Sequence, residues 1–335
     1  MPSRRWRALT PYLLLAPGVL WLAVFYVYPA IQMFATSLYS GSLEHGYRLT
    51  WEWGTYPEAL ARYSEHFGRS LVYGGAATVV TFLIGYPLAY AIAFRGGRYR
   101  NLLLFLVIAP FFTSFLLRTI SWKIILGDDG IVLGPLKDVG LLGPDFRLLA
   151  TPVAVVSGIA YNFLPFMTLP IYVALEKVDR RLVEAAEDLY AGPWRPGGTI
   201  AGALAGAGLF AWLGFAFVWN VPLMALVGAC AGAALGTLFL SQAFLRVTLP
   251  LSLPGVFAGT LLTFIPAMGD YVNAELLGTP QTRMIGNVIQ TRFLTNNDYP
   301  TAAALSFLLM AAILVAVALY ARLLGTEGLV RAKTL

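Results

Sequence analysis

Few residues in this chain could do chemistry, because 58% of its 335 residues are hydrophobic and only 12% are charged. An acidic side chain inside an apolar segment is costly, so it is a functional candidate by default. Asp270 fits this description, and Glu275 follows closely. Tyr161 and Asn162 interrupt another apolar run and could line a cavity, while Trp122 offers an aromatic face. Such groups can bind a ligand through hydrogen bonds and cation–π contacts.

Two of these residues also have simpler explanations. Asp270 lies at the end of its apolar run, where a carboxylate could face water, and Trp122 could anchor a helix at the membrane interface. Asp128 and Asp129 lie between two apolar runs and suit either a receptor contact or an ordinary solvated loop. The sequence alone leaves these alternatives open.

Several kinds of chemistry are not expected. Two histidines and a single cysteine, Cys230, cannot build a familiar metal site. The chain has no Gly-Lys pair and therefore no phosphate-binding loop of the Gly-x-x-x-x-Gly-Lys type. It also lacks Gly-x-Ser-x-Gly and His-Glu-x-x-His. We therefore predict a chain that is not an enzyme and binds no cofactor, so that active transport would draw energy from a gradient or from another chain.

Long apolar runs must position these residues. Each run approaches the length that crosses a hydrocarbon core of about 30 Å as a helix, and none alternates as a barrel strand does. The predicted class is therefore an all-α polytopic transmembrane protein. The predicted spans are residues 11–34, 70–94, 102–125, 152–175, 199–219, 222–241, 252–271 and 301–323.

The basic residues predict the orientation of these spans. Lys and Arg gather on the side that holds both termini, the turn 95–100 and the polar segment 176–197. By the positive-inside rule, that side is cytoplasmic. The net charge of +6 is then explained by membrane insertion, and no nucleic-acid partner is expected.

A polar segment at residues 183–194 differs from the rest of the chain. Glu184, Ala185 and Ala186 begin a short amphipathic stretch that also holds Asp188. Acidic residues favour a helix N-terminus, and alanines leave a low surface that another protein can approach. The same residues would also suit an ordinary solvated loop helix.

The segment resembles the coupling loop, or EAA loop, of ABC importer permeases. Its front half is Glu184-Ala185-Ala186, and its back half is Val247-Thr248-Leu249-Pro250. Further stretches extend the resemblance over most of the chain and are similar to the first permease of spermidine/putrescine-type importers: residues 110–119, 124–128, 264–272 and 284–286.

This resemblance implies a six-span permease core of the type I kind in a bacterial plasma membrane. It also implies a second permease subunit, two ATP-binding subunits that hold ATP and Mg, and an extracytoplasmic substrate-binding protein. The residues implied in coupling to the ATPase are Glu184, Ala185, Ala186, Asp188, Tyr190, Leu249 and Pro250. Tyr190 departs from the family pattern, because glycine is expected there to let the chain turn without steric cost.

The coupling loop is also split by residues 195–241. The predicted domains are therefore a permease domain, residues 1–194 and 242–335, and an inserted transmembrane hairpin, residues 195–241. Glycine recurs at every fourth residue in both runs of the hairpin, which favours close helix packing in lipid. The hairpin could pack on itself or on the permease rim, or it could have no role of its own.

The resemblance implies a polyamine as substrate. A flexible polycation needs carboxylates for its amines and aromatic faces for its methylenes, so Asp270, Tyr161, Asn162, Trp122 and Glu275 are the pathway candidates. Iron, thiamine or phosphonate remain alternatives within the same importer class. A gradient-driven carrier, which would need inverted repeats and buried ionisable relays, and a membrane scaffold without transport are the alternatives outside it.

Overall fold

The computed structural model describes residues 15–128, 130, 133–138, 143, 145–179, 181–182 and 247–324. The front half of the coupling motif and the inserted hairpin, residues 195–241, lie outside the described residues. The described part forms two compact units: residues up to Glu65 with Val288–Ala312, and residues of His66–Asn287 with those from Ile313 onward. Helices α3 (Thr55–Tyr90) and α14 (Tyr299–Leu324) each contribute to both units.

The first unit holds the only strands among the described residues. After η1 (Ala23–Val27) and α2 (Tyr28–Ser37), strands β1 (Tyr39–Ser42) and β2 (Gly46–Leu49) pair antiparallel. Gly46 has a φ of +76°, which glycine adopts readily and which suits the end of a short hairpin loop. The sequence predicted only a polar stretch here. The unit ends with η7 (Thr291–Thr295) and the first turns of α14.

Helix α3 is longer than the predicted span 70–94. It continues into η2 (Ala91–Arg95), so the helical run covers Thr55–Arg95, or 41 residues. The early turns carry charged residues such as Glu58 and Arg62. Hydropathy detects only the apolar part of such a helix, which explains why its polar beginning was not predicted.

The predicted span 102–125 is broken. It consists of η3 (Gly97–Tyr99), α4 (Arg100–Ile108), η4 (Ala109–Phe112) and α5 (Phe115–Ile125), and the two halves meet at 93°. Pro110 cannot donate a backbone hydrogen bond, which favours an end to the α-helix. Thr113 and Ser114 are extended, and the Thr113 hydroxyl donates to the Pro110 carbonyl (2.7 Å). The predicted span is therefore present as a bent pair of helices.

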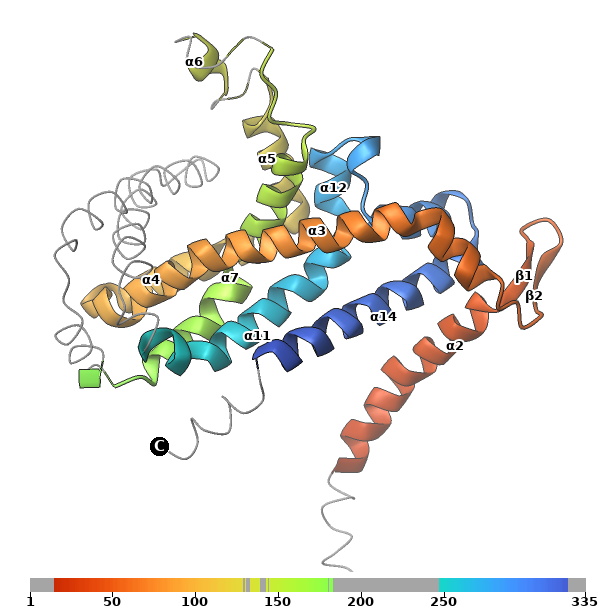
Figure 1. Cartoon of the computed structure of the whole chain (residues 1–335), viewed down its shortest axis with the longest axis horizontal. Helices are drawn as coiled ribbons and strands as arrows, with labels where there is room; N and C mark the ends of the chain where they lie inside the picture. The colour runs from red at the N-terminus through yellow and green to blue at the C-terminus, as the bar shows by residue number, and fades with distance from the viewer. Residues whose placement is uncertain are drawn as a thin grey trace, which may run out of the picture. The chain divides into compact units, whose positions relative to one another are not determined.

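The second unit is built on α7 (Pro152–Glu176) and α11 (Leu249–Met268), which Figure 1 shows side by side. Two glycines of α11 permit this approach. A Cβ at Gly255 would lie 2.5 Å from the Pro170 carbonyl oxygen, and one at Gly259 would lie 3.0 Å from that of Met167. The unit also holds the short elements α6 (Leu133–Asp138), α12 (Val272–Leu277) and η6 (Pro280–Thr282), and α13 (Ile285–Gln290) begins in it and ends in the first unit.

Five described helices are long and apolar enough to cross a membrane, and counting the bent pair as one span gives six. The predicted spans 11–34, 152–175, 252–271 and 301–323 match Leu15–Ser37, Pro152–Glu176, Leu249–Met268 and Tyr299–Arg322 within a few residues. The all-α polytopic membrane class is therefore confirmed. The two further spans predicted in 195–241 stay a prediction.

Candidate functional site

Three helices of the second unit, α5, α7 and α12, and the connection before α12 bring polar side chains together in an otherwise apolar interior. Helix α5 buries one face, which carries Thr119 and Trp122. Helix α7 contributes Asn162 from its middle, and α12 contributes Asn273 from its first turn. Asp270 lies between α11 and α12. The bend before α5 is what allows this face to reach α7 and α12 (Figure 1).

Asn273 is the centre of this buried network. Its Oδ1 accepts hydrogen bonds from Asn162 Nδ2 (3.2 Å) and from Thr119 Oγ1 (3.3 Å). Its Nδ2 donates to Asp270 Oδ2 (2.5 Å). The side chain is fully buried, and it fits because Gly158 has no Cβ: an added Cβ would lie 2.9 Å from Asn273 Oδ1. These hydrogen bonds join α5, α7 and α12, while the Oδ1 atom of Asn162 has no hydrogen-bond partner among the described residues.

Asp270 is a buried carboxylate, with 7% of its surface exposed. Its Oδ1 accepts the backbone N–H of Asn273 (3.1 Å), which lies in the first turn of α12. Burial raises the pKa of the Asp270 carboxyl, and the hydrogen bonds from Asn273 and Val272 oppose that shift. The alternative that Asp270 is a carboxylate facing open water is therefore wrong for this chain.

Trp122 and Tyr161 form the aromatic part of the cluster. Their rings meet edge to face, with centroids 5.4 Å apart and planes at 63°. Trp122 is 1% exposed, so it is a core residue, and the alternative of an interface anchor is wrong. Tyr161 is only partly buried. Four of the five pathway candidates chosen from the sequence thus lie in one cluster: Asp270, Tyr161, Asn162 and Trp122.

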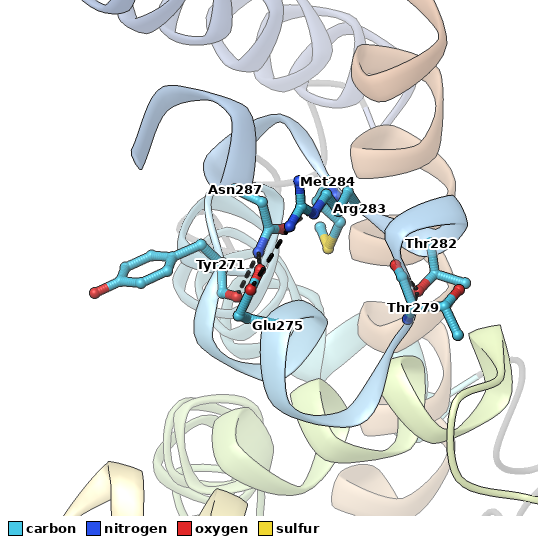
Figure 2. Close-up of polar contacts among 7 residues, drawn as sticks. All are labelled: Tyr271, Glu275, Thr279, Thr282, Arg283, Met284 and Asn287. Carbon is cyan, nitrogen blue, oxygen red and sulfur yellow. Dashed lines mark hydrogen bonds and ion pairs between the residues drawn. The ribbon is translucent and has the colours of Figure 1, made fainter. Parts of the chain in front are cut away.

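Glu275, the fifth candidate, belongs to a separate polar contact set (Figure 2). Asn287 Nδ2 donates to Glu275 Oε2 (3.0 Å) and to the Tyr271 carbonyl (2.9 Å). The Arg283 guanidinium lies 3.8 Å from the other Glu275 oxygen. Asn287 Oδ1 also accepts the Met284 N–H (3.1 Å). Glu275 therefore helps to shape the loop between α12 and α13, and its side chain is about half exposed.

Two residues of α3, Arg69 and Ser70, hold the same loop through three hydrogen bonds. Arg69 donates to the backbone carbonyls of Gln281 and Arg283. Ser70 Oγ accepts the Ile285 N–H (2.9 Å). A capping box between Thr279 and Thr282, drawn in Figure 2, closes the turn. Because its backbone groups are bonded in this way, the loop is a fixed part of the unit.

Arg118 is the residue that sequence reasoning missed, because its charge was counted only as evidence for topology. It lies one turn before Trp122 on α5 and is 8% exposed. Its guanidinium lies over the rings of Phe111 (5.4 Å) and Phe115 (5.8 Å). A charged residue that closely follows phenylalanines within an apolar run was the available signal.

The back half of the coupling motif begins α11. Leu249 packs against the apolar core that α3, α4 and α7 share, and Pro250 is exposed. Tyr86 of α3 and Ser252 of α11 share a buried hydrogen bond (2.6 Å). The C-terminal end of α7, Glu176, pairs with Arg100 of α4. Both helices that border the coupling segment are therefore fixed to neighbouring helices, whereas Glu184, Ala185, Ala186, Asp188 and Tyr190 lie outside the described residues.

Comparisons with known proteins agree on the class of molecule. Residues 238–324 match the family described as "Binding-protein-dependent transport system inner membrane component". The "Spermidine/putrescine transport system permease protein PotB" of Haemophilus influenzae is 36% identical over 289 residues, which cover 85% of this chain and 84% of that protein. The protein of the same description from Escherichia coli strain K12 is 31% identical, covering 86% and 88% of the two chains.

A solved structure shows the same fold. A bacterial ABC transporter involved in the import of the acidic polysaccharide alginate contains a chain that superposes with a TM-score of 0.58 at 17% identity. The match covers 95% of this chain and 96% of that chain. At this level of identity the likeness concerns the fold alone.

Proposed function

The chain belongs to the family of spermidine/putrescine transport system permease proteins, and we propose that it forms part of the polyamine pathway of an ATP-driven importer. The observation that carries this proposal is 36% identity over 85% of the chain to a permease of that description. The chain is an inner membrane transport component with several transmembrane helices.

The pathway candidates under this proposal are Asp270, Tyr161, Asn162 and Trp122. Their clustering on α5, α7 and the α11–α12 connection supports the assignment, because a carboxylate, an amide and two aromatic rings meet there. Amines bind such acceptors and ring faces. Glu275 is only a peripheral candidate under this proposal, since its carboxylate already accepts a hydrogen bond from the Asn287 side chain.

Energy would come from partner chains. We assign the coupling role to Glu184, Ala185, Ala186, Asp188, Tyr190, Leu249 and Pro250, which would dock on one of the two ATP-binding subunits that carry ATP and Mg. The firm attachment of Leu249 to the apolar core supports this role, since a docking segment must transmit force to the spans. The domain assignment, with residues 195–241 as an inserted hairpin, is part of the same proposal.

The remaining partners are a second permease subunit and an extracytoplasmic substrate-binding protein. The family description, which names binding-protein-dependent transport, supports the binding protein. The distribution of Lys and Arg supports cytoplasmic termini in the plasma membrane of a bacterium.

The test is uptake by the assembled importer in proteoliposomes. ATP-dependent accumulation of radiolabelled spermidine or putrescine that requires the binding protein is the expected result. Glu184→Lys should abolish coupling, whereas Glu44→Lys, in the hairpin loop of the first unit, serves as the charge-matched control. ATP-dependent uptake of iron, thiamine or a phosphonate, without polyamine uptake, would show that the proposed substrate is wrong and that the proposed importer class is right. Uptake driven by an ion gradient without ATP would overturn the importer itself.

A further inference from the structure

Arg118 and Asp270 are the only charged residues that lie buried in the described part of the chain, and their charges are opposite. Arg118 is 8% exposed and Asp270 is 7% exposed. A charge in an apolar interior is costly unless it is paired or hydrogen-bonded. The groups that contact each of the two side chains therefore decide whether the described arrangement satisfies both charges.

Neither charge has a counter-ion in this arrangement. The Nε and Nη1 atoms of Arg118 have no hydrogen-bond acceptor among the described residues, and its guanidinium lies over the rings of Phe111 and Phe115. The Asp270 carboxylate accepts hydrogen bonds from the neutral groups of Asn273 and pairs with no described Lys or Arg. A guanidinium keeps its proton in proteins, and a ring face accepts no directed hydrogen bond of ordinary strength. Arg118 therefore lacks an anionic acceptor, and Asp270 lacks a cation.

The burial of Arg118 determines where such an acceptor can come from. Its two unsatisfied atoms have almost no accessible surface, so a group outside this chain does not reach them. The acceptor must therefore lie in the same interior, and Asp270 is the one buried carboxylate that the described residues supply. Planar carboxylates match the guanidinium fork with two parallel hydrogen bonds.

A short series of side chains connects the two residues. Thr119 follows Arg118 on α5 and donates to Asn273 Oδ1 (3.3 Å). Asn273 Nδ2 in turn donates to Asp270 Oδ2 (2.5 Å). The Thr119 hydrogen bond, and the one from Asn162 Nδ2 to Thr119 Oγ1 (3.4 Å), are both longer than ordinary hydrogen bonds of their types. The contacts of α5 with α7 and α12 therefore include hydrogen bonds that a small movement of α5 would break.

The start of α5 allows such a movement. Thr113 and Ser114 are extended between two helices that meet at 93°, and the Ser114 side chain does not cap α5. Connecting residues of this kind absorb backbone rotation between rigid elements. Consecutive side chains leave a helix about 100° apart, so a rotation of α5 that withdraws Thr119 from Asn273 brings Arg118 toward the same place. A change of the Arg118 rotamer reduces the rotation that is needed.

We propose that Arg118 forms an ion pair with Asp270 in a second conformation of the importer and thereby displaces a polyamine ammonium from that carboxylate. This inference rests on the proposed function, which supplies the polyamine. In the described conformation the guanidinium is withdrawn onto the phenylalanine rings, which leaves Asp270 free of a competing cation. In the second conformation the two buried charges neutralise each other, and the guanidinium repels the ammonium. Arg118 thus acts as a tethered competitor that promotes substrate release.

The first experiment measures this competition at the site. Radiolabelled spermidine is bound at equilibrium to the purified importer without the binding protein, and ATP-dependent uptake is measured in proteoliposomes that include it. Arg118→Gln removes the competing cation, so spermidine should bind about fivefold or more tighter, while the turnover of uptake should fall by a similar factor because release is slower. Lys123→Gln removes an exposed charge from the same helix and, as the matched control, should change neither value. Unchanged or weaker binding by Arg118→Gln overturns the inference, since tighter binding is the effect that a merely structural role does not produce.

A second experiment leaves both charges intact, in case Arg118→Gln fails to fold. Spin labels attached to Leu117→Cys and Tyr271→Cys, both at exposed positions, report the distance between α5 and the start of α12 in a chain that carries Cys230→Ser. The substrate-free importer should show two distances, and saturating spermidine should remove one of them, as should Asp270→Asn. A single distance that does not depend on spermidine overturns the inference. Two distances in an importer that takes up no polyamine would instead refute the proposed function and still support the ion pair.

Discussion

The close approach of α7 and α11 depends on Gly255 and can be tested by adding one methyl group. In Gly255→Ala the new Cβ would lie 2.5 Å from both Ala174 Cβ and the Pro170 carbonyl oxygen. Ordinary contacts lie at 3.4–4 Å, so the two helices must separate by about 1 Å. Neither obstacle can rotate away, since one is backbone and the other is a Cβ atom. Overpacking of this kind costs about 1–3 kcal/mol.

Gly75→Ala provides the matched control, because a Cβ at Gly75 on α3 meets nothing within 4 Å. Both changes gain about 1 kcal/mol of helix propensity, so the difference between the two variants isolates the steric cost. We expect Gly255→Ala to unfold more readily by about 1–3 kcal/mol, or about 5-fold to 150-fold in the folded-to-unfolded ratio. Unfolding of the assembled importer in denaturing detergent mixtures, followed by tryptophan fluorescence, measures this. Equal stabilities for the two variants would refute the backbone-to-backbone contact of α7 and α11.

The buried network and its aromatic neighbours give three further expectations for the same assay. Asn273→Leu should destabilise the fold by about 1–3 kcal/mol, because it leaves the Asn162 amide, the Thr119 hydroxyl and the Asp270 carboxylate without their shared partner. Because the pKa of Asp270 is raised in the fold, the folded state favours its protonated form. Its contribution to stability is therefore present at acidic pH and is lost as the pH rises through the folded pKa. Asp270→Asn should flatten that part of a stability-versus-pH curve, and an unchanged curve would count against the burial of Asp270. Trp122→Ala should cost about 3–5 kcal/mol, whereas an interface anchor at that position would lose far less.

The sequence predicted which residues belong to the candidate site, but it did not predict that they lie close together in space. Asp270, Asn162 and Trp122 stand out in the sequence because a polar or large aromatic side chain within an apolar run is a candidate for a specific role. Their meeting depends on the bend after Phe112, which turns the buried face of α5 toward α7. Hydropathy over 102–125 is continuous, so the pattern predicts one span and conceals the bend. Pro110 was the available signal, and only the packing around it fixes the angle.

Asn273 and Arg118 show why the remainder could not be found from the sequence. Asn273 lies in a short polar stretch after a span, where an amide would ordinarily face water. Its importance comes from Asp270, three residues before it, and from Thr119 on α5 and Asn162 on α7, which are distant in sequence. Arg118 was counted with the other basic residues because charge distribution predicts topology. Phe111 and Phe115 precede it closely in sequence, but its burial against them depends on the bend before α5 and on the packing of that helix.

The helices that border the coupling segment also carry the buried cluster, and this links the two ends of the permease. From Asn162 to Glu176, α7 extends about 21 Å toward the coupling segment, and α11 returns from Leu249 to Met268, just before Asp270. The two helices cannot slide independently without breaking the contacts at Gly255 and Gly259. Asn162 and Asp270 are bonded to the same asparagine at the other end. A displacement imposed at Leu249 would therefore be carried as a rigid pair to the network, where it must either move Asn273 with it or break its hydrogen bonds. A coupling segment bound to one ATPase could thus control the shape of the cluster without contacting it.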